Sequence, residues 1–151
     1  MPSASIATLV GSLCVTEVDG AICELAWRDV ENSDTTALLC RAIEQLRAYF
    51  AAELQVFDLP LQVAGSDFQR RVCDAMLAIP FGETRTYGDI GRDLRAPAQP
   101  IGNACGANPI PVIIPCHRVL GANGLGGFSG RGGVETKVTL LKHEGAAGLL
   151  I

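Results

Sequence analysis

The chain has 151 residues, of which 48% are apolar and 19% charged, and its formal net charge is −4. This length predicts one domain or two small subdomains, and the apolar fraction is enough for a folded core rather than a disordered chain. No run of 18 apolar residues occurs, so we expect no membrane span. The first residues lack the basic and apolar segments of a signal peptide, which predicts a cytoplasmic protein.

The charge is divided unevenly along the chain. Residues 1–65 carry three basic and nine acidic residues, a net charge of −6, whereas residues 66–151 carry nine basic and seven acidic residues, a net charge of +2. A mildly basic second half permits binding to nucleic acid but does not demonstrate it.

The cysteines do not follow the spacing of a metal site. No two are arranged C-x-x-C, and the chain has only two histidines, so we expect no metal. In a reducing compartment the expectation is six free thiols, of which all but Cys116 serve packing. The six are Cys14, Cys23, Cys40, Cys73, Cys105 and Cys116.

The first sixty residues predict a small sheet with one helix. Residues 12–18 and 21–27 are strand-like and are joined by Asp19-Gly20, a hairpin signal because both turn positions need positive φ. Pairing across this turn is expected to form one largely apolar face from Cys14, Thr16, Val18, Ala21, Cys23, Leu25 and Trp27. Apolar residues at helical spacing then predict an amphipathic helix that buries Leu39, Ile43, Leu46, Phe50 and Leu54.

A connector over residues 57–65 leads to a second group of helices. Ser66 and Gln69 are spaced as a capping box, and the helix that they open is expected to end at Pro80. Its expected buried residues are Phe68, Val72, Met76 and Ile79. A last helix over residues 134–144 is expected to pack Val138 and Leu141 inward and to stop at Gly145.

Two short helices are predicted between these. One begins after Thr86, with Asp89 near its N-terminus, and the other runs from about residue 100 to residue 107 with Pro100 in its first turn. Two short helices joined by a tight turn are typical of a helix-turn-helix. The second helix is rich in small residues, which suits either a close approach to a DNA groove or tight packing between helices.

Residues 113–119 carry the strongest chemical signal. A β-branched run leads through Pro115 into Cys116, His117 and Arg118. The pKa of a free cysteine is near ~8.5, and we expect the neighbouring imidazole and guanidinium to lower it. Pro115 is expected to end a strand and to turn the thiol into a site, although a buried packing cysteine is the alternative. The glycine-rich residues 121–133 could form a pocket wall, and they lack the spacing of a phosphate loop.

Several separated motifs resemble the O6-alkylguanine-DNA alkyltransferases, also called methylated-DNA–protein-cysteine methyltransferases. The resemblance covers about residues 65–145, and its specificity comes from the order of the motifs. In chain order they are Phe68-Gln69, Ile79-Pro80-Phe81-Gly82-Glu83, Tyr87-Gly88, Asn108-Pro109-Ile110-Pro111, Pro115-Cys116-His117-Arg118-Val119 and Leu140-Leu141-Lys142-His143-Glu144-Gly145.

The resemblance implies an α/β (α+β) fold. A sheet-plus-helix subdomain over residues 1–60 would precede a DNA-binding and alkyl-acceptor domain over residues 65–151. It also implies direct-reversal DNA repair, in which Cys116 takes the alkyl group from O6 of guanine in double-stranded DNA and keeps it as a thioether. An alkyl group on O4 of thymine is a further candidate substrate. Each molecule would act once, as a monomer and without a cofactor.

The resemblance also assigns roles to residues. Glu144 would orient His117, which activates Cys116 through a water, while Tyr87 assists the departing base and Asn108 braces the thiol loop. The residues expected to bind the substrate are Val119, Ser129, Arg118, Phe128 and Cys105. The residues expected to contact DNA are Gln99, Pro100, Gly102, Ala98 and Thr86.

The chain departs from the family pattern at several positions. Gln99 stands where an arginine usually fills the space left by the flipped base, and we expect Pro100 to hold Gln99 in an extended conformation. Cys73 replaces a tryptophan, Phe128 replaces a tyrosine, and Cys105 replaces a larger apolar residue.

Two other functions remain open at this point. One is an alkyltransferase-like protein that binds and flags alkylated bases without repairing them, although such proteins lack the reactive cysteine. The other is a Cys-His-Glu hydrolase of amides or esters, which would turn over repeatedly.

Overall fold

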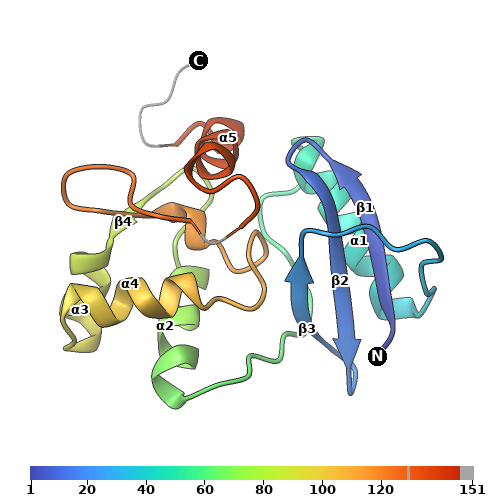
Figure 1. Cartoon of the computed structure of the whole chain (residues 1–151), viewed down its shortest axis with the longest axis horizontal. Coiled ribbons are helices and arrows are strands. Elements are labelled where there is room, and N and C mark those ends of the chain that lie inside the picture. Colours follow the sequence, from blue (N-terminus) through green and yellow to red (C-terminus); the bar gives the residue numbers. More distant parts are fainter. Residues whose placement is uncertain (129, 147–151) are drawn as a thin grey trace. The chain divides into compact units, whose positions relative to one another are not determined.

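A computed structural model describes residues 1–128 and 130–146 of the chain (Figure 1). The chain divides into two compact units, Met1–Ala64 and Gly65–Ile151, and the division falls at the end of the predicted connector. Both helices and strands are present, so the predicted mixed α/β class is confirmed. None of the helices in the described part of the chain is both long and apolar enough to cross a membrane.

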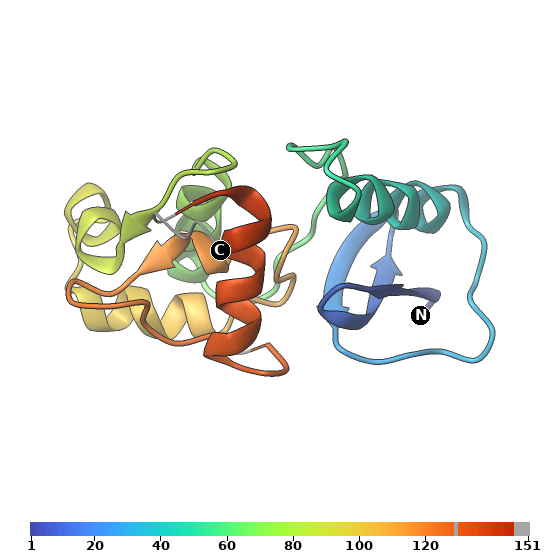
Figure 2. The same ribbon diagram turned by 90° about the horizontal axis from the view of Figure 1, so that it is seen from above.

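The first unit is a three-stranded antiparallel sheet with one helix on it. The strands β1 (Ser3–Thr8), β2 (Gly11–Val18) and β3 (Ala21–Ala26) lie in the order β1-β2-β3, and α1 (Ala37–Phe50) packs along one side of them (Figure 2). Asp19 and Gly20 have φ values of 48° and 78°, which confirms the predicted hairpin turn. Sequence reasoning missed β1, because its small and polar residues carry little strand propensity.

The predicted apolar face of the hairpin is wrong beyond Thr16. Thr16 pairs with Glu24 whereas Glu17 pairs with Ile22, so Cys23 is an extra residue in β3. One extra residue reverses which side chains face the core. Ile22 and Leu25 are therefore buried, while Cys23 is only half-buried.

The buried stripe of α1 also differs from the prediction. Thr36 caps the helix by accepting a hydrogen bond from the backbone N–H of Leu39 at 3.1 Å. Ile43 and Phe50 lie at the edge of the stripe and are only half-buried, and the helix ends before Leu54 because the chain turns at Ala51. The fully buried residues are Leu39, Ala42, Leu46 and Tyr49.

Within its described residues, 65–128 and 130–146, the second unit contains four α-helices, a two-stranded parallel sheet and one 3-10 turn. The helices are α2 (Asp67–Leu77), α3 (Tyr87–Leu94), α4 (Ala98–Gly106) and α5 (Val134–Glu144). The strands β4 (Arg85–Thr86) and β5 (Val119–Leu120) pair in parallel, and the turn η1 (Cys116–Arg118) leads into β5. Helices α2, α3 and α4 pack on one another, and α5 packs on η1. The core residues include Val72, Met76, Ile79, Ile90, Ile101, Ile110, Ile114, Leu140 and Leu141.

The helix-turn-helix is formed by α3 and α4. Thr86 and Asp89 make the complete capping box at the start of α3. The turn between the helices is tight, because a Cβ on Gly91 would lie 2.5 Å from the carbonyl oxygen of Ala96. Helix α4 begins at Ala98, so Gln99 is helical and the expected extended conformation is wrong. Pro100 fits the first turn because no intrahelical N–H bond is needed there.

The capping box of α2 forms only in part. Ser66 accepts a hydrogen bond from the backbone N–H of Gln69 at 3.1 Å, as predicted. The Gln69 side chain, however, donates to the carbonyl of Ala104 at 2.8 Å and so ties α2 to α4 instead of reaching back. Phe68, expected to be buried, is half-buried. The contact of Gln69 with Ala104 in α4 thus replaces the expected local contact with the N-cap.

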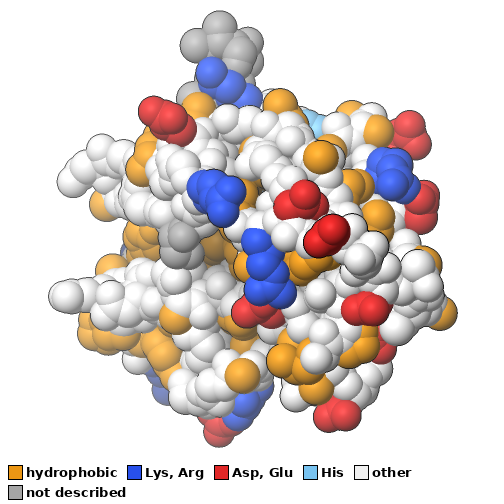
Figure 3. Space-filling view, turned by 45° about the vertical axis from the view of Figure 1, so that its right-hand side comes forward, with side chains coloured by type: hydrophobic (Ala, Val, Ile, Leu, Met, Phe, Trp, Pro, Cys, Tyr) orange, Lys and Arg blue, Asp and Glu red, His pale blue; other side chains and the backbone are white. Residues whose placement is uncertain are grey.

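Figure 3 shows one face of the molecule, on which acidic and basic side chains are interspersed with apolar ones. No single sign of charge gathers on this face. The uneven charge of the two halves is therefore not expressed there as one large basic surface.

Candidate active site

The segment before Cys116 is a buried turn, and the strand predicted there is wrong. Pro111 and Ile114 form an isolated bridge, and the Ile114 N–H donates to the Ile110 carbonyl at 2.8 Å. Val112 has a φ of 72°, a conformation that costs a β-branched residue about 1–3 kcal/mol. The run of apolar β-branched residues thus reflects the burial of this turn and not a β-strand.

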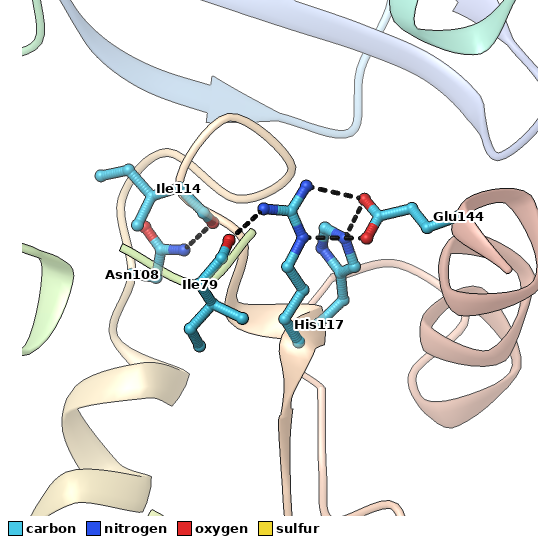
Figure 4. A network of polar contacts seen from close by, with 6 residues as sticks. Ile79, Asn108, Ile114, His117 and Glu144 are labelled. Carbon is cyan, nitrogen blue, oxygen red and sulfur yellow. Dashed lines mark hydrogen bonds and ion pairs between the residues drawn. The ribbon is translucent and has the colours of Figure 1, made fainter. Parts of the chain in front are cut away.

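Asn108 holds this turn in place. Its side-chain N–H group donates to the carbonyl of Ile114 at 2.8 Å (Figure 4). Its side-chain oxygen accepts from the N–H of Ile110 at 3.0 Å. Asn108 is itself buried, so both hydrogen bonds are shielded from water. Asn108 thus holds the backbone at Ile114, which lies two residues before Cys116.

Cys116 lies at the edge of a pocket of about 420 Å³ within the second unit. Cys116 is 5% exposed and begins η1. Residues from α3, α4 and the glycine-rich loop complete the wall, and the loop must approach Tyr87 closely, because a Cβ on Gly126 would lie 2.8 Å from its hydroxyl. The lining residues are Tyr87, Gly102, Cys105, Gly106, Cys116, Gly127 and Phe128.

A buried network lies behind the thiol. His117 Nε2 is 2.8 Å from Glu144 Oε2, and Arg118 contacts both Glu144 oxygens, at 2.8 and 3.0 Å. Arg118 also donates to the Ile79 carbonyl at 2.6 Å (Figure 4). Since Nε2 faces a carboxylate, it carries the imidazole proton, and Nδ1 keeps its lone pair. His117 Nδ1 is buried and accepts no hydrogen bond from the described residues. The network therefore presents a neutral imidazole with a free basic nitrogen.

The ionisation of the site corrects one prediction. Burial raises the pKa of the Cys116 thiol to about 11, against the lowering effects of a hydrogen bond from Asn108 and the charge of Lys137. Burial likewise lowers the pKa of His117, so the imidazole is neutral at pH 7. Arg118 is turned toward Glu144. The expectation that His117 and Arg118 lower the thiol pKa is therefore wrong, and the thiol is protonated at rest.

Sequence reasoning missed Lys137. This side chain of α5 is fully buried, and its ammonium donates to the carbonyls of Val119 at 2.6 Å and Gly127 at 3.0 Å. It also lies 5.9 Å from the centre of the Tyr87 ring. Burial lowers the pKa of Lys137, while the nearby Cys116 and Cys105 raise it. Lys137 thus joins the glycine-rich loop to β5 and places a positive charge near the thiol.

A signal for Lys137 was present in the sequence. Lys137, Leu140, Leu141 and Glu144 recur at helical spacing and form the inward stripe of α5, whereas Val138, expected to point inward, is half-buried. A lysine on an apolar stripe next to a loop of glycines is unusual, because a buried ammonium needs partners.

The remaining predicted residues fall in three places. Ala98, Gln99 and Pro100 are exposed in the first turn of α4, and Thr86 caps α3. Gly102 faces the Tyr87 ring, and a Cβ there would lie 3.9 Å from it. The pocket wall includes Phe128 and Cys105, and the Val119 carbonyl accepts a hydrogen bond from Lys137. Ser129 lies outside the described residues.

These features define a class of protein: a helix-turn-helix domain whose buried thiol is backed by a His–Glu pair. The family model of the 6-O-methylguanine DNA methyltransferase DNA-binding domain matches residues 67–146. The chain belongs to this methyltransferase family, as the sequence motifs predicted.

Individual relatives agree with this membership. The methylated-DNA–protein-cysteine methyltransferase of Mycolicibacterium paratuberculosis is 53% identical over 106 residues, which cover 68% of this chain and 63% of that protein. The chain thus matches less than two thirds of that relative's length. The protein of the same name from Methanosarcina acetivorans is 48% identical over 120 residues, 78% of this chain and 74% of that protein.

Solved structures are also similar. O6-methylguanine methyltransferase of Mycobacterium tuberculosis is 38% identical with a TM-score of 0.83, covering 95% of this chain and 92% of that one. The M. tuberculosis protein OGT in complex with DNA is 40% identical with a TM-score of 0.83, covering 99% and 98%.

Proposed function

We propose that this protein repairs O6-alkylguanine in double-stranded DNA by moving the alkyl group irreversibly to Cys116, as a methylated-DNA–[protein]-cysteine S-methyltransferase. The observation that carries the proposal is the buried thiol at a pocket, with His117 Nδ1 free and Nε2 held by Glu144. The protein relatives named above and the complex of one of them with DNA support the same activity.

The chemistry begins with a proton. His117 Nδ1 takes the Cys116 proton, through a bridging water as the family resemblance implies, and Glu144 stabilises the imidazolium that forms. Arg118 keeps Glu144 in place through its two contacts. This arrangement produces the thiolate when a substrate is bound, although burial keeps the resting thiol protonated.

The thiolate then attacks the alkyl carbon. A carbon–sulfur bond forms, the bond between that carbon and O6 breaks, and its electron pair returns to the guanine ring. Tyr87 lines the pocket and is placed to donate its hydroxyl proton to the departing base. Water does not hydrolyse the resulting thioether, so each molecule acts once and no cofactor is consumed.

Binding in this pocket requires a flipped base. Taking a nucleotide out of the stack costs a few kcal/mol, and the exposed first turn of α4 would insert into the minor groove with Gln99 in the vacated space. The Val119 carbonyl can read the guanine amino group while it accepts from Lys137, because a carbonyl oxygen has two lone pairs. The family resemblance implies that the Ser129 amide meets O6, and Ser129 lies outside the described residues.

The two other functions are less well supported. An alkyltransferase-like lesion sensor has no use for a thiol with a base behind it, and the family matches favour repair. A hydrolase would form a thioester on Cys116 that water opens and would turn over repeatedly, whereas the family matches favour alkyl transfer. A monomeric protein in the cytoplasm, where thiols stay reduced, completes the proposal.

Stoichiometry tests the proposal. Wild-type protein is mixed with a tenfold excess of duplex DNA containing O6-methylguanine, and restored guanine is measured by restriction cleavage of the repaired duplex. We expect one guanine restored per protein molecule and no further turnover. Continued turnover would indicate a hydrolase, and binding without any restored guanine would indicate a lesion sensor.

A further inference from the structure

The pocket in front of Cys116 contains a second thiol. Cys105, near the end of α4, lines the same pocket as Cys116, and each residue is 5% exposed. Neither cysteine is in a disulfide. Nothing in the alkyl transfer uses a thiol at Cys105, where the family resemblance leads us to expect a larger apolar side chain.

Asn108 contacts both of these cysteine residues. Its backbone N–H donates to the carbonyl of Cys105 at 3.3 Å, and its side chain hydrogen-bonds the Cys116 thiol. Asn108 therefore contacts the backbone of Cys105 and the side chain of Cys116, and both cysteines line the same pocket. In agreement, burial and then the nearby charge of an ionised Cys116 raise the pKa of Cys105 to about 12.

The surroundings limit what two such thiols can bind. Within residues 1–128 and 130–146, no group of three His, Cys, Asp or Glu side chains could hold a metal ion, whereas zinc in proteins takes at least three such ligands. Trivalent arsenic that already carries one organic substituent needs only two sulfurs. The rest of the pocket, about 420 Å³ with Tyr87 and Phe128 in its wall, offers space for that substituent.

We propose that Cys105 and Cys116 together form a dithiol site for organic arsenoxides, R–As=O, with R held in the base pocket. Two As–S bonds form and two S–H bonds break, and the arsenic oxygen leaves as water with the two thiol protons. Arsenic remains trivalent, so no oxidant or reductant takes part. Because Cys116 is one of the two ligands, the bound arsenical blocks the alkyl acceptor until a competing dithiol removes it.

Phenylarsine oxide is the probe for a first test on wild-type protein. One equivalent should give a native mass corresponding to one phenylarsenic group per chain. Digestion at acidic pH should then yield a phenylarsenic bridge between Cys105 and Cys116. An excess of 2,3-dimercaptopropanol should release the arsenical, whereas the same concentration of 2-mercaptoethanol should not. A bridge from Cys116 to Cys73, or two separately bound groups that a monothiol removes, would overturn the proposal.

Variants test the pairing independently. Loss of one of two linked bonds typically weakens binding by about 100-fold or more, so we expect this loss in Cys105→Ala, Cys105→Ser and Cys116→Ser. Cys73→Ala, at a buried thiol outside the pocket wall, and Cys40→Ala, at an exposed thiol, should bind as wild type does. Folded Cys105 variants with unchanged affinity would overturn the proposal. Alkyl transfer by untreated wild-type protein is measured in parallel, so a failure of this site is distinct from a failure of the proposed function.

Discussion

Replacing His117 with alanine should change both the rate of alkyl transfer and its dependence on pH. With a pKa of about 11, the Cys116 thiol is ionised in only about 0.03% of molecules at pH 7.5, against about 10% for an ordinary cysteine. A base that takes the thiol proton during the attack compensates for the small ionised fraction, and positioned general bases typically raise reaction rates by about 10²–10⁴-fold. We therefore expect His117→Ala to be slower by about 100-fold or more at pH 7.5.

The pH profile separates this role from a structural one. Burial lowers the pKa of His117, so the imidazole is already neutral at pH 7 and the wild-type rate should be nearly constant from pH 7 to pH 9. The His117→Ala rate should instead rise about tenfold per pH unit, because only the spontaneous thiolate reacts. Single-turnover rates with free O6-benzylguanine measure both profiles without a DNA-binding step.

A matched control is available in the second histidine. His143 lies beside Phe81 and outside the pocket wall, so His143→Ala should keep the wild-type profile. If His117→Ala reacted within threefold of wild type at pH 7.5, or if wild type itself rose tenfold per pH unit, the role of His117 as the base would be refuted.

Four further predictions follow from the same contacts. Glu144→Gln should slow alkyl transfer, and the His117→Ala/Glu144→Gln double variant should be only slightly slower than the slower of the two single variants, because His117 and Glu144 act as one relay. Additive losses in the single-turnover rates would contradict this. Lys137→Met leaves two backbone carbonyls without their buried donor, so chemical denaturation should show a loss of about 1–3 kcal/mol, and an unchanged stability would show that the ammonium is not needed there. Gln99→Arg should speed transfer from duplex DNA but leave the reaction with free O6-benzylguanine unchanged; equal rates of wild type on duplex and single strands would show that Gln99 is no handicap. Finally, because the pKa of His117 is lower in the folded than in the unfolded protein, stability should fall as the pH drops below about 6.5, and His117→Ala should reduce this slope in denaturation curves at pH 5–7.

Local signals were predicted well from the sequence. The Asp19-Gly20 turn and the start of a helix after Thr86, with Asp89 in its first turn, each depend on residues within three positions of one another, and both formed as expected. The order of motifs around Cys116 also identified the family before any fold was known. Short-range geometry and motif order are properties of the sequence itself, so no tertiary information was needed for them.

The features that were predicted wrongly from the sequence depend on contacts between distant segments. Gln69 left its expected partner for Ala104, which lies 35 residues away, and the β-branched run before Cys116 formed a buried turn because Asn108 holds it. The extra residue Cys23 in β3 could not be predicted from the alternation of apolar and polar residues. A β-bulge changes which side chains face the core without changing the composition of the strand. Each of these depends on a partner that periodicity does not specify.

The electrostatics of the site were the least predictable part. Sequence neighbours suggested that Arg118 would lower the pKa of Cys116, yet Arg118 turns to Glu144, 26 residues away. The buried positive charge near the thiol is Lys137, which comes from another helix. Burial, which raises the pKa of the thiol, cannot be read from three consecutive residues.

The most direct test of the central claim is to locate the transferred group. Wild-type protein is incubated with duplex DNA that carries a deuterated methyl group on O6 of guanine, and its cysteine peptides are mapped by mass spectrometry. We predict one deuterated methyl per chain, on Cys116 alone, and none in Cys116→Ser under the same conditions. A methyl found on Cys105 or Cys73 instead, or a repaired duplex with no methyl on the protein, would contradict the assignment of Cys116 as the alkyl acceptor.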